Sequence, residues 1–127
     1  MKEFYFPVRQ DTKIHCCQWV PEGKPRGIIQ IVHGIAEYAA RYDELAKVFT
    51  DHGFVVVGED HMGHGGSISE NIPQGCFADG WLTAVSDSYR LLQMTKEVCM
   101  NLLGLESGYL SSMNMSSHRP WFNLLLG

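Results

Sequence analysis

Two short stretches of the 127-residue sequence combine residue types that could do chemistry. His33-Gly34-Ile35 places an imidazole beside a glycine turn, directly after an apolar run. Asp60, His61 and the nearby residue His64 bring together one carboxylate and two imidazoles, and this set of groups can hold zinc.

The second stretch can also be interpreted as a structural turn without a metal. No third strong ligand recurs nearby, and His-Met-Gly-His lacks the helical H-E-x-x-H spacing of a zinc motif. We favour a turn in which Asp60 accepts hydrogen bonds from local backbone N–H groups, while His64 and Gly65 shape a loop beside a pocket. We therefore expect no metal and no cofactor, and a metal-assisted hydrolase using Asp60, His61 and His64 stays the weaker alternative.

The elements that must position both stretches form a strand–helix–strand unit. Residues 27–32 are an almost unbroken apolar run, as in a strand buried on both faces. Apolar residues at helical spacing from Tyr38 predict a helix of about four turns, with Gly53 as its C-terminal cap. Residues 54–57 form a second β-branched run, closed by Gly58. Two such strands joined by a helix predict a parallel βαβ unit.

A hairpin is predicted before this unit and a loop after it. Residues 4–8 and 13–20 read as two antiparallel strands, and Pro7 places the first at an edge because it cannot donate to a ladder. Residues 65–78 contain many turn residues and are expected to form a long surface loop.

A second helix is predicted after Asp79, which can cap it. Its apolar positions are spaced by three and four residues, so they are expected to share the face packed on the sheet: these are Leu82, Val85, Tyr89 and Leu92. The polar residues expected on its other side are Ser86, Asp87, Arg90 and Gln93.

Composition excludes several classes of partner. A net charge of −4 gives no basic footprint for nucleic acid, and no apolar stretch is long enough for stable membrane insertion. Adjacent strand residues point to opposite faces, so Cys16 and Cys17 are a poor disulfide pair. Reduced thiols in a cytoplasmic protein are the simplest interpretation.

The strings HGIAEYAARY and EDHMGHGGS carry a family resemblance. They resemble the paired signature of α/β-hydrolases of the monoacylglycerol lipase and lysophospholipase type, also grouped with serine aminopeptidases (S33-like). In that family an HG-x-x-E-[HY]-x-x-RY turn follows the third strand, and a D-H-x-G-H-G-x-S loop follows the fourth. The resemblance covers roughly residues 3–97. It implies an α/β fold, namely the N-terminal portion of an α/β-hydrolase with a hairpin, a parallel βαβ unit and a following helix.

The resemblance also implies a role for the first stretch. In α/β-hydrolases a backbone N–H just after the third strand helps to stabilise the oxyanion of acyl transfer. By position this donor is the Ile35 N–H, while His33 and Gly34 form the turn that aims it. The Ile35 side chain would then line the acyl pocket.

Further residues are expected to support that turn from a second layer. Glu37, Arg41 and Tyr42 are placed to hold it, and Glu37 and Arg41 are four residues apart, a spacing that permits an ion pair. A solvated helix face is an equally good interpretation, since an exposed pair contributes only about 0.5 kcal/mol. Asp60 and His64 are expected to support the turn from the second loop.

The catalytic triad of such a hydrolase is not recognisable. No G-x-S-x-G occurs, and the nearest string, residues 104–108, has Ser107 one place late. No Asp or Glu follows Ser107, so His118 has no downstream acid to orient it. We expect residues 1–98 to be the N-terminal part of a hydrolase domain, truncated before the nucleophile elbow, and residues 99–127 to be an atypical tail.

Two functional hypotheses follow. The first is a truncated serine ester hydrolase that, when intact, cleaves carboxylic esters of lipids, and that is inactive as this chain. The second is a non-catalytic interaction module built on a half sheet. In that case residues 28–32 or 54–57 would be an open edge, and the chain would self-associate through it.

Overall fold

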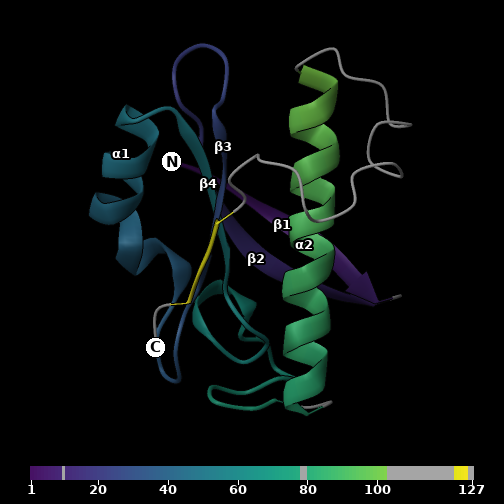
Figure 1. Cartoon of the computed structure of the whole chain (residues 1–127). Coiled ribbons are helices and arrows are strands. Elements are labelled where there is room, and N and C mark those ends of the chain that lie inside the picture. The colour runs from purple at the N-terminus through teal and green to yellow at the C-terminus, as the bar shows by residue number, and fades with distance from the viewer. Residues whose placement is uncertain (10, 78–79, 103–121, 126–127) are drawn as a thin grey trace.

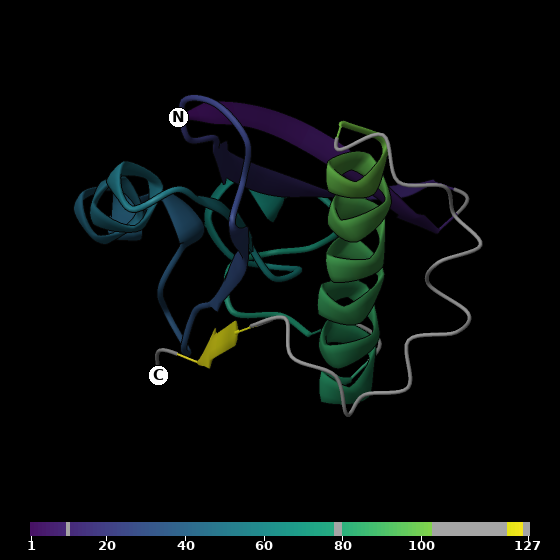
Figure 2. The same cartoon turned by 45° about the horizontal axis from the view of Figure 1, so that its top comes forward.

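The computed structural model describes residues 1–9, 11–77, 80–102 and 122–125. Its five strands are β1 (Lys2–Arg9), β2 (Thr12–Trp19), β3 (Gly27–Val32), β4 (Phe54–Glu59) and β5 (Phe122–Leu125). Its α-helices are α1 (Asp43–Asp51) and α2 (Trp81–Leu102), and short 3-10 helices span Ala39–Tyr42 and Gly65–Ser67. The strands lie in the order β1-β2-β4-β3-β5, with α1 on one face of the sheet and α2 on the other (Figures 1 and 2).

The N-terminal hairpin forms as predicted. Strands β1 and β2 are antiparallel, with Lys2 opposite Gln18 and Pro7 opposite Lys13. Strand β1 is the edge strand. An edge strand tolerates Pro7, which has no backbone N–H to donate to a neighbouring strand. Strand β2 continues the sheet by pairing antiparallel with β4.

The predicted βαβ unit is also present. Strands β3 and β4 are parallel and in register, from Gly27 opposite Phe54 to Val32 opposite Glu59. Their carboxyl ends therefore meet, which brings the segments after Val32 and Glu59 side by side. Gly53, at φ +87°, ends the connecting segment in the left-handed conformation that favours glycine.

Two details of this unit differ from the prediction. The connection is a 3-10 helix followed by a nine-residue α1, and Tyr38 before it is extended. The Ala39 N–H, which has no acceptor within the helix, donates to Asp60 Oδ1. Gly58 lies inside β4 and does not close it. A Cβ at Gly58 would lie 3.2 Å from the Ala39 Cβ, so the missing side chain makes room for the 3-10 helix.

The sheet separates two apolar cores. The α2 side contains Cys16, Val55 and Leu91, and the α1 side contains Cys17 and Val56. The alternation of β2 thus sends Cys16 and Cys17 to opposite faces, as predicted, and all four cysteines are free.

The face that α2 turns to the sheet is not the predicted one. Leu82 is 73% exposed and Tyr89 61% exposed, whereas Leu91 and Asp87 are buried. Of the predicted inward stripe, Leu92 alone is buried. The prediction was wrong because the sheet presents polar groups to α2, and these contact the polar face of the helix. Gln30 of β3, for example, donates a hydrogen bond to the Ser88 carbonyl oxygen.

The loop after β4 is only partly a surface loop. Ser67 in its 3-10 helix is buried, and Ser69 and Ile72 form an isolated β-bridge. The predicted cap Asp79, together with residue 78, lies outside the described residues.

The expected open edge at residues 28–32 or 54–57 is contradicted by the strand order. Strand β4 lies between β2 and β3, and β3 pairs on its other side with β5, in parallel, from Ile29 opposite Phe122. The segment 99–127, expected to be an atypical tail, supplies β5. Ser107 and His118 lie outside the described residues. Within the part of the chain that the structure describes, no helix is long and apolar enough to cross a membrane.

Candidate functional site

The turn after β3 is closed by two reciprocal hydrogen bonds. The Glu37 N–H donates to the Gly34 carbonyl at 3.3 Å, and the Gly34 N–H donates to Glu37 Oε2 at 3.1 Å. Between them, Ala36 has φ +64°, a left-handed conformation that costs a non-glycine residue about 1–2 kcal/mol. This turn leaves the Ile35 side chain 87% exposed.

The Ile35 backbone N–H belongs to an exposed residue of the turn after β3. Among the described residues, no group accepts a hydrogen bond from it. Ile35 also lines a groove of about 590 Å³ between the end of β3 and helix α2. The walls of this groove include the apolar side chains of Val32, Val85 and Leu92. A free amide beside an apolar groove can donate to an oxyanion whose acyl chain occupies the groove.

The three residues predicted to hold the turn do contact it or one another. The Tyr42 hydroxyl donates to Glu37 Oε2 at 2.5 Å, and Arg41 lies 3.5 Å from Glu37 Oε1. The hydrogen bonds from Tyr42 and from the Gly34 N–H lower the pKa of Glu37. Glu37 is therefore a carboxylate at neutral pH, so its Oε2 can accept both of these hydrogen bonds.

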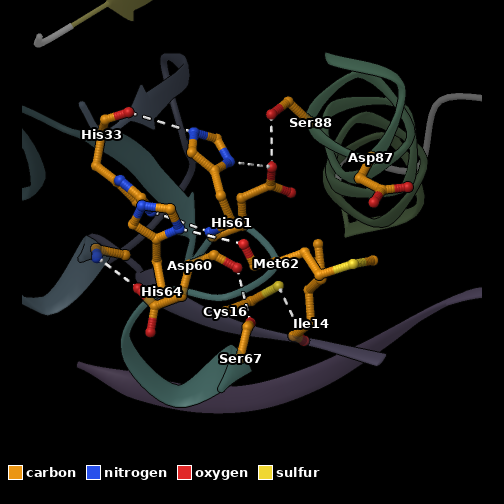
Figure 3. A network of polar contacts seen from close by, with 12 residues as sticks. Ile14, Cys16, His33, Asp60, His61, Met62, His64, Ser67, Asp87 and Ser88 are labelled. Atoms are coloured by element: carbon orange, nitrogen blue, oxygen red, sulfur yellow. Dashed lines mark hydrogen bonds and ion pairs between the residues drawn. The ribbon is translucent and has the colours of Figure 1, made fainter. Parts of the chain in front are cut away.

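His33 supports the turn from below with both ring nitrogens in use. Its Nε2 accepts the His61 backbone N–H at 2.9 Å, so the proton must be on Nδ1, which lies 2.8 Å from the Gly34 carbonyl oxygen. Burial lowers the pKa of His33 to about 4. His33 is thus a neutral, fixed imidazole that links the two loops, as Figure 3 shows.

A buried polar network joins this pair of loops to α2. His61 lies between the His33 carbonyl oxygen, 3.2 Å from its Nε2, and Glu59 Oε1, 3.0 Å from its Nδ1. The Ser88 hydroxyl donates to the same Glu59 oxygen at 2.5 Å (Figure 3). The second oxygen, Glu59 Oε2, is buried and has no hydrogen-bond partner among the described residues. Sequence reasoning missed Glu59 and Ser88, although a Glu ending an apolar strand is a signal that could have found the first.

Asp60 holds the loop after β4 by accepting hydrogen bonds from backbone N–H groups, as predicted from the sequence. Its Oδ1 accepts the Ala39 N–H at 2.6 Å, and its Oδ2 accepts the Gly66 N–H at 2.8 Å. The same Oδ2 lies 2.8 Å from His15 Nδ1, a contact that the sequence did not indicate. A side chain at Gly65 would clash with Asp60, so glycine is required there.

His64 lies beside the groove and does not line it. It is 3% exposed, and its Nδ1 is 3.1 Å from the Met62 carbonyl oxygen. Its ring centroid lies 5.1 Å from that of Phe77 and 5.3 Å from that of His33, both of which line the groove.

This geometry argues against a metal held by Asp60, His61 and His64. Both ring nitrogens of His61 and both carboxylate oxygens of Asp60 already have hydrogen-bond partners. Within the described part of the chain, the group of side chains close enough to share a metal ion is a different one and lies on the hairpin.

The mixed sheet, its two flanking helices and the tight turn after β3 define an α/β-hydrolase. The family model described as Serine aminopeptidase, S33 matches residues 23–102, and the chain belongs to this family.

Comparisons with individual proteins agree with this assignment. The chain is 29% identical over 109 residues to "Monoglyceride lipase" of Mus musculus, covering 86% of this chain and 36% of that protein. It therefore spans about a third of the length of the curated relatives it matches.

Solved structures show the same fold. A thermostable carboxyl esterase from Bacillus coagulans matches 76% of this chain and 32% of its own, with TM-score 0.64 and 31% identity. A monoglyceride lipase from Saccharomyces cerevisiae has TM-score 0.62 at 17% identity, over 73% of this chain and 30% of its own. The expected family and fold class are thus confirmed.

Proposed function

We propose that this chain forms the oxyanion-binding half of a serine ester hydrolase of the monoacylglycerol lipase and lysophospholipase type, with lipid carboxylic esters as substrates. The observation that carries the proposal is the free Ile35 N–H at the rim of an apolar groove. Attack on an ester carbonyl places negative charge on its oxygen, and a preorganised amide stabilises that charge.

The residues around the turn have positioning roles in this proposal. Glu37 fixes the Gly34 N–H, and Tyr42 and Arg41 hold Glu37. Asp60 and His64 shape the neighbouring loop, and His33 ties that loop to the turn. The apolar groove wall formed by α2 would hold the acyl chain of a lipid ester.

The same proposal holds that these 127 residues do not complete the reaction by themselves. The sequence has no G-x-S-x-G and no acid after Ser107. The four free cysteines support a cytoplasmic location, which is part of the proposal.

A serine-directed fluorophosphonate probe tests the absence of a nucleophile. The purified chain should show no labelling and no turnover of a p-nitrophenyl ester, with the related mouse lipase as the positive control. Labelling that disappears in Ser107→Ala would overturn this part of the proposal.

The interaction module is kept as a second candidate because α2 exposes large apolar side chains. Trp81 is 70% exposed, and Leu82 and Tyr89 of the same helix are exposed too. Such a surface favours association with another protein or with a second copy of the chain. A concentration-independent monomer by light scattering would count against self-association.

A further inference from the structure

A group of three potential metal ligands lies on the N-terminal hairpin, apart from the groove. The Glu3 carboxylate, the His15 imidazole and the Cys17 thiol each place one ligand atom within 4.8 Å of the other two. Glu3 and Cys17 are directly opposite in the β1–β2 ladder. His15 precedes Cys17 by two residues, so both side chains leave β2 on the same face.

His15 is held with one nitrogen available. Its Nδ1 lies 2.8 Å from Asp60 Oδ2 and donates to this carboxylate, so Nε2 is the nitrogen that can bind a metal ion. This Nε2 faces Glu3 Oε1 at 3.9 Å. The His15 backbone is also fixed, because its N–H donates to Ser67 Oγ at 2.8 Å. A carboxylate behind an imidazole is the arrangement that orients metal-binding histidines in proteins.

The local charge favours a cation. Two carboxylates flank the His15 ring: Asp60 Oδ2 lies 2.8 Å from its Nδ1, and Glu3 Oε1 lies 3.9 Å from its Nε2. These negative groups would attract a divalent ion.

We propose that Glu3, His15 and Cys17 form a zinc site with water in the fourth position. One sulfur, one nitrogen and one oxygen ligand suit the borderline-soft Zn²⁺ ion. In a tetrahedral zinc site, ligand atoms are about 3.4–3.8 Å apart. The Glu3 side chain is 57% exposed, which leaves it room to move toward a bound ion.

Binding at this site exchanges one proton for one metal ion. The Cys17 S–H bond breaks, the sulfur–zinc bond forms, and the proton is released to the buffer, with no change of oxidation state. The bound ion would join β1 to β2 and thereby stabilise the hairpin against separation of its strands. This role does not depend on the proposed ester hydrolase function.

Cobalt(II) titration of the full reduced chain tests the site, since Co²⁺ replaces Zn²⁺ and reports thiolate ligation by a sulfur-to-cobalt charge-transfer absorption. The wild-type chain should show this absorption, and Zn²⁺ should displace it. Cys17→Ser should abolish it. Cys16→Ser is the matched control, because Cys16 is equally buried but faces the other side of β2 and should leave the absorption unchanged.

A second variant keeps the test decisive if Cys17→Ser does not fold. Glu3→Gln changes an exposed residue and should weaken zinc affinity at least about tenfold, while the far-ultraviolet circular dichroism stays the same. No charge-transfer absorption in the wild type, an unchanged absorption in Cys17→Ser, or an unchanged zinc affinity in Glu3→Gln would each overturn the proposal.

Discussion

His33 and Glu37, the polar residues nearest the turn after β3, have defined hydrogen-bond partners. His33 cannot act as a proton acceptor for a substrate, because a backbone N–H occupies its Nε2 and the Gly34 carbonyl oxygen faces its Nδ1. Ile35 offers what His33 lacks, namely a donor that no described residue uses. The proposed function therefore uses a backbone amide as the donor, and His33 has a positioning role in it.

The buried, neutral His33 makes folding stability depend on pH. Its pKa is about 4 in the folded chain against 6.5 for the ordinary group, so between these values the unfolded chain binds a proton that the folded chain excludes. Stability should therefore fall as the pH is lowered from 6.5 toward 4, by up to about 3 kcal/mol. Urea unfolding of the wild type and His33→Gln at pH 7 and pH 4.5 measures it. The glutamine variant should lose less stability on acidification, and an equal loss in both would contradict the assignment.

Ala36 predicts a stabilising substitution. Because its φ is +64°, Ala36→Gly should relieve backbone strain and raise the free energy of unfolding by up to about 1 kcal/mol. Gly75→Ala is the reverse control, since Gly75 has φ +77° with open space around it and should lose about as much. Denaturant unfolding compares the two, and a destabilised Ala36→Gly variant would show that the turn is not strained.

At the scale of elements, polar contacts determine which face of α2 packs on the sheet. Leu82 and Tyr89 of the predicted apolar stripe are exposed and Val85 lines the groove, while Ser88 and Asp87 are buried. Ser88 bonds Glu59 at the end of β4, and Gln30 of β3 bonds the Ser88 backbone. These contacts hold α2 against the two strands whose ends carry the site.

The Ser88–Glu59 hydrogen bond should be worth more than an ordinary surface contact. Ser88→Ala leaves the buried Glu59 carboxyl with one partner fewer, so the free energy of unfolding should drop by about 1–3 kcal/mol. Ser86→Ala is the matched control on the exposed face of the same helix and should change it by less than about 0.5 kcal/mol. Similar values for the two variants would mean that the network does not anchor α2.

For the whole molecule, the parallel pairing of β3 and β4 decides where the site forms. The carboxyl ends of both strands meet at one end of the sheet, and the two loops that follow are joined by the bond from the His61 N–H to His33. Sites in open α/β sheets form at such strand ends. The Ile35 turn therefore lies at the end of the sheet where the carboxyl ends of β3 and β4 meet.

Sequence patterns predicted the parts of this molecule that depend on local order. The βαβ unit and the turn at Gly34 follow from apolar runs and glycine positions. The inward face of α2 could not be predicted, because it depends on Gln30 and Glu59, which belong to other elements. The Glu3–His15–Cys17 group was missed for a similar reason, since it exists only in the hairpin register.

The Ile35 amide gives the most direct test of the proposed oxyanion role. We would record amide NMR spectra of the labelled chain while adding decanoate, whose carboxylate can accept the Ile35 N–H while its chain enters the groove. The proposal predicts a downfield shift of the Ile35 amide proton that saturates, with shifts at Val85 and Leu92 of the groove wall and none at the remote His52. Decanoate that leaves the Ile35 amide unmoved, or that shifts it no more than His52, would contradict the central claim.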